Sequence, residues 1–555
     1  MSLEVRRFIK TPAFWAVLVG VAGLFLRVWA FWRSPALWDD ELSLSINVVR
    51  MGYLDLLQPL QFAQSAPVGF LWLQRLSVDI FGPGERSLRL PALITGLATL
   101  PLLWLVARRV AGEWAGALAL ALASLSPYCV RYTNEAKQYG VEAFVSAVLL
   151  AAALFYPRRD LKFSSFAGLA ALGCGAIALS NASIFGLAAL AWLLAMDGGH
   201  LREGRDRWWL GWTCTIWAGS FGLSYALFHS ADVQYGGYFT RFFAPVRITE
   251  QPDVLAASLS VLHGFLDPLF ALDQRMPAPL LVLAAALLVI GIGEIWIAGE
   301  RRIALLAPLA FVLLAGLAGK WYMVARLMMF TAPLVAVLLA AGSVRVASLF
   351  SRLRHQELAV AGISILLLVF PVKADRYTSS HPLSFARQGV AFARRQMRPG
   401  DVVYLYSKAV PAWMFYSTDW RRPDRDRLEW LAAASLLTGP NGGNIPSRGH
   451  KVVLEGWDLR RPYRDAWELV GEPEGILRTA SGPASNPPDS GWVENEYERV
   501  MRDSKGRIVV IGLWITPRSY SQFLQSFQGS GFRTVAEYAN EGVSVVVLEA
   551  PPPAR

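Results

Sequence analysis

Long apolar runs recur along the first two thirds of the chain and are separated by short polar connections. Most approach the length of about 20 residues that an α-helix needs to cross a bilayer. We predict about eleven such spans, near residues 13–32, 87–107, 114–131, 139–156, 164–180, 182–197, 208–229, 279–298, 303–319, 327–346 and 357–372. The pattern predicts a polytopic α-helical membrane protein, because helices satisfy their own backbone polar groups in lipid.

Basic residues are concentrated in alternate short connections between these spans. The connections rich in arginine and lysine contain Arg6, Arg7, Lys10, Arg108, Arg109, Arg158, Arg159, Lys162, Arg202, Arg205, Arg207, Arg301, Arg302, Arg352 and Arg354. The positive-inside rule therefore predicts a cytoplasmic N-terminus. An odd number of spans then places the C-terminus outside, together with the longer outer loops 33–86 and 230–278.

The composition changes near residue 373, where polar residues and Pro-Gly clusters return. Short β-branched runs then alternate with helical patterns such as "PRSYSQFLQSFQGSGF", and these runs read "DVVYLY", "KVVLEGW", "RIVVIGLW" and "VSVVVLEA". Strands alternating with helices predict a small α/β domain outside the membrane. We therefore divide the chain into a transmembrane domain, 1–372, and a C-terminal extracytoplasmic domain, 373–555.

The overall composition agrees with a membrane protein. Of the 555 residues, 54% are hydrophobic and 17% are charged, whereas charged residues make up about a quarter of a typical soluble protein. The net charge of +11 is explained by arginine in cytoplasmic loops, and since no nucleic-acid-binding motif is found we expect no nucleic-acid partner. The three cysteines have no CxxC spacing, so neither a zinc site nor a disulfide framework is indicated.

Three consecutive acidic residues follow the first predicted span, namely Asp39, Asp40 and Glu41. One interpretation is local: acids at the start of the short surface helix "DELSLSINVVRMG" favour its N-terminus. Arg27 lies within that first span, and two interpretations stay open for it, since it could snorkel to the interface or line a cavity.

Other predicted outer boundaries also carry ionisable residues, and these are Glu135, Lys137, Lys320 and Arg326. Charges clustered at several span ends on one side indicate a functional cavity that opens outward. Carboxylates opposite cations suit a reaction in which a hydroxyl loses its proton to a general base while cations neutralise a departing phosphate. A divalent cation (Mg, Mn or Ca) at Asp39 and Asp40 is an open alternative, and no cofactor is certain.

Five segments carry a resemblance to a known superfamily. In chain order they read "LWDDELSLSINV", "QSAPVGFLWLQRLSVDIFGPGERSLRLPAL", "ARRVAGEWAGALALALASLSPYCVRYTNEAKQYGVEAF", "YFTRFFAPV" and "VARLMMFTAPLVAVLLAAG". Together they resemble the GT-C superfamily over roughly residues 10–350. More narrowly, the chain resembles bacterial membrane glycosyltransferases related to protein O-mannosyltransferases and lipid A aminoarabinose transferases.

The resemblance implies a GT-C fold in the bacterial inner membrane and a sugar donor carried on a polyprenyl phosphate. Soluble nucleotide sugars are expected inside, whereas the predicted cavity opens outside, so a lipid-linked donor is the available substrate. The acceptor is then a hydroxyl of a cell-envelope glycan, lipid or protein, and we expect inversion by direct displacement. Membrane lipids are further expected partners.

The resemblance also assigns roles to individual residues. The family's acidic pair in the first outer loop falls on Asp40, the expected base, and Glu41. The family's Glu-Ala-Arg-x-Tyr pattern is met by Glu135, Lys137 and Tyr139, where lysine replaces arginine and loses its two-pronged donor geometry. For the lipid phosphate, Arg326 is the first candidate, Lys137 the second and Lys320 the third.

Two other functional classes stay open at this stage. A transporter or flippase for lipid-linked sugars also needs charges in a membrane cavity, but it is typically built from repeats with broken helices, which the sequence does not indicate. A non-catalytic lipid-binding subunit could also retain the fold. The sequence leaves the sugar, the acceptor and the oligomeric state open.

Overall fold

The computed structural model describes residues 11–62, 64–156, 163–196, 204–234, 243–270, 277–299, 303–349, 356–369, 384–398, 401–405, 409–420, 423, 475–479, 506–513, 517–540 and 543–551. The chain forms two compact units. The first comprises residues Met1–Ser34, Ala66–His229 and Phe239–His381, and the second comprises Pro35–Ser65, Ser230–Tyr238 and Pro382–Arg555. Each unit is described in turn below.

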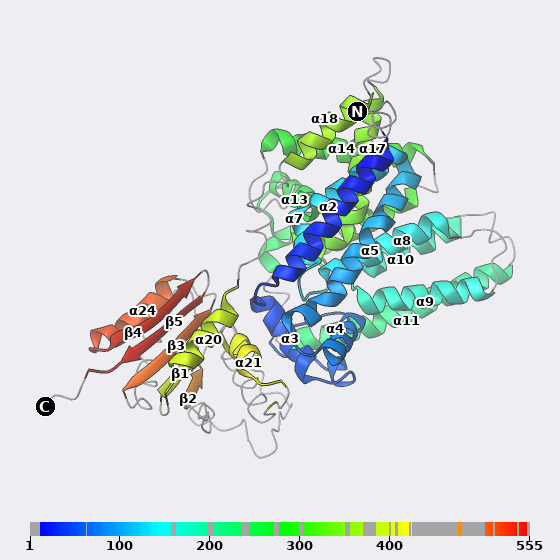
Figure 1. Cartoon of the computed structure of the whole chain (residues 1–555). Helices are drawn as coiled ribbons and strands as arrows, with labels where there is room; N and C mark the ends of the chain where they lie inside the picture. The colour runs from blue at the N-terminus through cyan, green and yellow to red at the C-terminus, as the bar shows by residue number, and fades with distance from the viewer. Residues whose placement is uncertain are drawn as a thin grey trace. The chain divides into compact units, whose positions relative to one another are not determined.

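The first unit is helical (Figure 1). Its α-helices are α2 Pro12–Arg33, α4 Val68–Phe81, α5 Glu85–Ala111, α6 Glu113–Leu125, α7 Pro127–Tyr132, α8 Tyr139–Phe155, α9 Phe163–Leu179, α10 Ser183–Met196, most of α11 Gly204–Gln234, α13 Val254–Phe270, α14 Ala278–Ile297, α16 Ala307–Leu317, α17 Ala332–Ser348 and α18 Gln356–Val369. Short 3₁₀ helices are η2 Ala244–Val246, η3 Ile248–Glu250, η4 Ala304–Leu306 and η5 Ala325–Thr331.

Helices occur at the positions of the predicted spans. Among the described residues, the helices that are long and apolar enough to cross a bilayer are Pro12–Arg33, Glu85–Ala111, Ala278–Ile297 and Ala325–Ser348. One apolar helix was not predicted: α13 lies inside the expected outer loop 230–278. Its 17 residues fall short of the length of about 20 that a span needs, and His263 and Asp267 interrupt its apolar run.

The predicted span 114–131 is interrupted at Ser126, where α6 ends and α7 begins. Pro127 has no N–H to continue the hydrogen-bond ladder of α6. The Ser126 hydroxyl instead accepts a hydrogen bond from the Cys129 N–H at 3.2 Å and caps α7. A hydropathy average does not register this break, because the residues on both sides are apolar.

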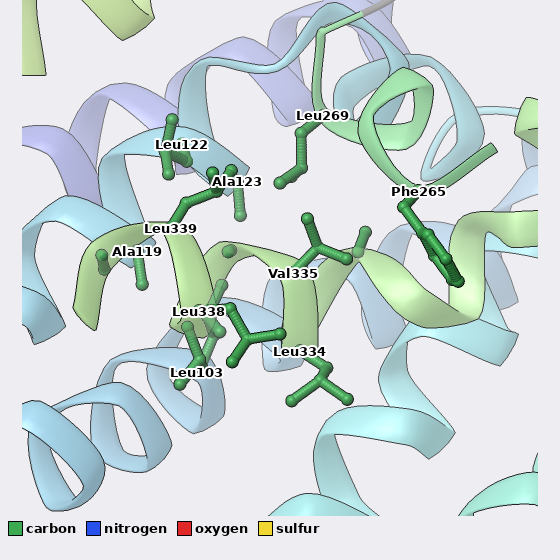
Figure 2. Packing of buried hydrophobic residues seen from close by; sticks show 14 of the residues in the cluster. Leu103, Ala119, Leu122, Ala123, Phe265, Leu269, Leu334, Val335, Leu338 and Leu339 are labelled. Atoms are coloured by element: carbon green, nitrogen blue, oxygen red, sulfur yellow. The ribbon is translucent and has the colours of Figure 1, made fainter. Parts of the chain in front are cut away.

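The core of the first unit is built around α17, in which every residue from Ala332 to Ser343 is buried. Figure 2 shows Val335, Leu338 and Leu339 of this helix among side chains from α5, α6 and α13, which include Leu103, Leu122 and Leu269. A helix that is apolar on all sides is typical of the centre of a membrane bundle. Helices α9 and α11 lie side by side (Figure 1), joined by a 3.1 Å hydrogen bond from the Trp217 indole N–H to the Leu169 carbonyl.

Arg27 is 2% exposed inside the bundle. Its guanidinium donates to the carbonyls of Ala123 at 2.9 Å and Ser124 at 3.1 Å, at the end of α6. The Ala123 carbonyl has no helical partner, because the residue four positions later is Pro127. Arg27 therefore completes the hydrogen bonding of a broken helix, and the snorkelling interpretation is wrong.

The second unit combines residues 35–65 with the C-terminal part of the chain. Its helices are α3 Asp39–Arg50, η1 Asp55–Leu57, α20 Ala386–Gln396, α21 Ala409–Ser417 and α24 Pro517–Gly529. Its strands are β1 Asp401–Leu405, β2 Gly475–Thr479, β3 Arg507–Leu513, β4 Arg533–Asn540 and β5 Val543–Glu549.

These strands form one mixed sheet in the order β2-β1-β3-β5-β4. β1 runs parallel to β2 and β3, whereas β5 runs antiparallel to β3 and β4, so that Val403 lies opposite Val509 and Val509 opposite Val547. Helix α20 packs on β3, β4 and β5, and α21 packs on β1 and β3. Asp401 and Arg507 form a buried ion pair of 2.7 Å that joins the first residues of β1 and β3.

The β-branched runs at β1, β3 and β5 and the helical pattern at α24 are confirmed as elements. "KVVLEGW" lies outside the described residues. β2 and β4 were not predicted from the sequence. In β4 most side chains are exposed, so the strand lacks the continuous apolar run that marks a buried one.

Candidate functional site

The three acids form the first turn of α3. The Trp38 N–H donates to Glu41 Oε2 at 3.2 Å, so Glu41 caps the helix from within its first turn. This confirms the local interpretation that the acids begin a helix. It is not a surface helix, however, because every residue from Glu41 to Val48 is buried. Glu41 itself is 1% exposed, and it therefore has a structural role whatever its chemistry.

Asp40 is half-buried and contacts a residue that the sequence analysis did not single out. The Gln64 side-chain amide donates to Asp40 Oδ1 at 3.5 Å and to the Phe62 carbonyl at 3.2 Å. Gln64 is 9% exposed, and the contact with Phe62 limits its freedom to turn away. The arrangement orients the Asp40 carboxylate.

Gln64 is kept in place by the chain segment that precedes it. The Gln61 N–H donates to Asn47 Oδ1 at 2.7 Å, and the Asn47 side chain returns a hydrogen bond to the Gln61 carbonyl at 3.2 Å. The Arg50 guanidinium binds the Gln61 side-chain oxygen. These hydrogen bonds hold the segment that contains Gln61 against α3. Asn47 is fully buried on this helix. Buried polar side chains need hydrogen-bond partners, so the asparagine among the apolar residues of α3 was the sequence signal that could have pointed to this contact.

In the first unit, the residues of the Glu-Ala-Lys-x-Tyr motif lie in a buried turn between α7 and α8. Glu135 and Lys137 are each 3% exposed. Glu135 Oε2 lies 3.3 Å from Nε of Arg131, four residues earlier. Buried charges need partners, so Arg131 belongs to this polar turn. The i, i+4 spacing of an arginine and a glutamate in "RYTNE" could have indicated it.

Tyr139 begins α8 and packs against α7. Its ring centroid lies 5.3 Å from that of Tyr132, which in turn lies 5.6 Å from Tyr128, and both pairs are edge-to-face. Tyr139 is 5% exposed. These ring contacts fix the geometry of the turn that contains Glu135 and Lys137.

Arg326 lies in η5, half-buried, with its guanidinium carbon 5.5 Å from the centre of the Phe243 ring. Phe243 stacks on Tyr322 with centroids 4.8 Å apart. The guanidinium carbon of Arg247, a residue between η2 and η3, lies 5.9 Å from the centre of the Tyr322 ring. These cation–π and stacking contacts join the two segments that contain them. Lys320 is exposed, and its backbone N–H closes the end of α16 on the Ala315 carbonyl at 2.8 Å.

Helix α8 packs against η5. Consequently the element that follows Lys137 and the element that carries Arg326 are neighbours, although they are far apart in the sequence. The acids belong to the second unit and these cations to the first. Within the parts of the chain that the structure describes, no three His, Cys, Asp or Glu side chains are grouped so as to hold a metal ion. Asp39 and Asp40 offer carboxylate oxygens, which hard divalent cations prefer.

Comparisons with known proteins agree with the resemblance inferred from the motifs. Residues 65–217 match the family model of dolichyl-phosphate-mannose-protein mannosyltransferases. No curated protein sequence matches the chain significantly.

Two solved structures share the fold along almost the whole chain. The crystal structure of ArnT from Cupriavidus metallidurans in the apo state has a TM-score of 0.53 at 13% identity, covering 96% of this chain and 98% of that one. The same protein bound to undecaprenyl phosphate has a TM-score of 0.51 at 15% identity, with the same coverage. The predicted resemblance to GT-C membrane glycosyltransferases is confirmed by the family match and by this fold.

Proposed function

We propose that this protein is an integral membrane glycosyltransferase. It moves a sugar from a polyprenyl-phosphate donor to a hydroxyl of a cell-envelope acceptor on the outer face of the bacterial inner membrane. The proposal is supported by the family match over residues 65–217 and by the shared fold with ArnT, which has been crystallised with undecaprenyl phosphate. The apolar helices agree with a membrane location.

The observation that carries the proposal is the placement of Asp40. A carboxylate that serves as general base must be oriented, yet accessible to a substrate. Asp40 is half-buried in the first turn of α3 and hydrogen-bonded through Oδ1 to Gln64. Glu41 is instead engaged in capping the helix, and for this reason Asp40 is the base and Glu41 its support.

The proposed transfer is a single displacement. Asp40 takes the proton of the acceptor hydroxyl, and the acceptor oxygen attacks the anomeric carbon of the sugar. The bond from this carbon to the phosphate oxygen breaks, and polyprenyl phosphate leaves with the electron pair. Attack from the opposite side inverts the anomeric centre.

Cations are required where the phosphate departs, because negative charge grows on its oxygens. We assign Arg326 and Lys137 to this role. Lys137 lies in a buried turn where a charge interacts strongly, and Arg326 is oriented by the Phe243 ring. Lys320 is exposed and contributes less. Glu135 and Tyr139 hold the turn around Lys137 through Arg131 and Tyr132.

The proposed topology keeps residues 1–372, with about eleven spans, as the transmembrane domain and 373–555 as an extracytoplasmic domain. The N-terminus is then cytoplasmic, and the loop containing Asp40 faces outward. A lipid-linked donor that has been moved to the outer leaflet is the substrate available on that side.

The test is an assay of polyprenyl phosphate release by the purified full-length protein, supplied with a panel of polyprenyl-phosphate sugars and cell-envelope acceptors. Asp40→Asn should lower kcat by about 10²–10⁴-fold, the usual contribution of a general base. Asp55→Asn is the matched control, since Asp55 is an exposed carboxylate of the same outer segment that accepts a local hydrogen bond from the Gly52 N–H.

Equal turnover by Asp40→Asn and wild type would contradict the assignment of the base. Movement of the lipid-linked sugar across the bilayer without release of polyprenyl phosphate would replace the transferase by a flippase. Donor binding by Asp40→Asn, measured by protection against thermal unfolding, shows that the variant is folded.

A further inference from the structure

The residue that leads into the acidic turn is held by the C-terminal part of the chain. Leu37 is fully buried. Its N–H donates to the Tyr416 hydroxyl at 2.7 Å, and its carbonyl accepts a hydrogen bond from the Ser384 hydroxyl at 3.0 Å. Both partners belong to the same compact unit as Leu37.

Buried backbone groups almost always have partners, most often within secondary structure. Here both backbone groups of one residue use side chains that lie 379 and 347 positions further along the chain. Tyr416 is carried by α21, a helix whose residues from Ala409 to Phe415 are all buried and which packs against α3. Ser384 lies two residues before α20. The contact is therefore part of a packed interior.

Leu37 and Asp40 are close in the sequence, so the position of Leu37 constrains the position of Asp40. The next residue, Trp38, donates its N–H to Glu41 and accepts the first helical hydrogen bond of α3, from the Leu42 N–H at 2.8 Å. With Leu37 and Trp38 both fixed, the first turn of α3 has one orientation. Gln64 then fixes the carboxylate within that turn.

We propose that Tyr416 and Ser384 are positioning residues for the base Asp40, so that the C-terminal α/β domain takes part in sugar transfer. This inference rests on the proposed function. The two hydroxyls hold the backbone of Leu37, and through it they keep the carboxylate in line with the acceptor hydroxyl. Small displacements of a catalytic group are costly, since a shift of about 1 Å can reduce the rate by about 10²-fold.

The experiment compares Tyr416→Phe and Ser384→Ala with Ser417→Ala in the full-length protein. Ser417 is the matched control, because it neighbours Tyr416 on α21 and donates its hydroxyl to the Trp413 carbonyl of the same helix. We expect Tyr416→Phe to lower kcat about tenfold, with the KM for the donor unchanged, and Ser417→Ala to match wild type.

A second comparison, made in the Asp40→Glu protein, distinguishes a positioning role of Tyr416 from a loss of folded protein. Asp40→Glu lengthens the base and removes the geometry that Tyr416 maintains. If Tyr416 acts through Asp40, Tyr416→Phe should cost less than twofold in the Asp40→Glu protein, because residues acting as a unit are not additive. A smaller folded fraction would instead reduce both proteins by the same factor.

Hydrogen exchange provides a readout that does not depend on activity. The peptide containing Leu37 should exchange faster in Tyr416→Phe than in Ser417→Ala, because the Leu37 N–H loses its acceptor. Faster exchange with unchanged kcat would overturn the inference while the proposed function stands. If Asp40→Asn keeps full turnover, the proposed function fails, and the exchange result still reports on the contact itself.

Discussion

Replacing Gly23 with alanine tests the packing of the first helix against α6. A β-carbon added at Gly23 would lie 2.6 Å from the Ser124 Cβ and 3.0 Å from its Cα. The same substitution three residues earlier, at Gly20, would place the β-carbon 3.6 Å from Leu120 Cδ2, an ordinary van der Waals contact. The two variants thus differ in packing but not in chemistry.

The magnitude follows from that difference. Alanine is favoured over glycine within a helix by about 1 kcal/mol, and this gain is common to both variants. At Gly23 the obstacle includes a backbone atom of Ser124, which no rotamer change can move, so the helices must separate. Overpacking of this kind costs about 1–3 kcal/mol. We therefore expect Gly23→Ala to be less stable than Gly20→Ala by about 1–3 kcal/mol.

The assay is reversible unfolding of the purified protein in mixed micelles, followed by tryptophan fluorescence as the fraction of denaturing detergent increases. Both variants are compared with wild type at the same protein and lipid concentrations. Gly20→Ala should match or exceed wild type. Equal stability of the two variants would refute the argument that α2 and α6 approach closely at Gly23.

Two further substitutions test other contacts. Arg27→Met should lower the free energy of unfolding by about 1–4 kcal/mol in the same assay, because it removes the donors that bind the Ala123 and Ser124 carbonyls. A loss of stability smaller than that of a control substitution on the exposed surface would contradict this role. Gln64→Leu should lower kcat by about tenfold, because the Asp40 carboxylate loses a donor that orients it. An unchanged kcat in Gln64→Leu would show that the Asp40–Gln64 contact does not matter in turnover.

Several features of this protein could be read from local sequence. The length and apolarity of the runs predicted the helices at the expected spans, since backbone hydrogen bonds in lipid are satisfied within each helix. The acids at Asp39 predicted the start of α3, because charge and capping act within one turn. The break before Pro127 was also readable, although averaging over apolar residues concealed it. Motif order was sufficient for the GT-C resemblance.

The long-range partners of buried polar groups were decided only by the tertiary structure. Arg27 meets carbonyls 96 and 97 residues away, and Leu37 meets a hydroxyl 379 residues away. Many other arginines and tyrosines in the chain carry the same donor and acceptor groups, so residue type alone does not select the partner. Which of them does so depends on how distant segments pack, and that packing is a collective property that local patterns of polarity do not encode.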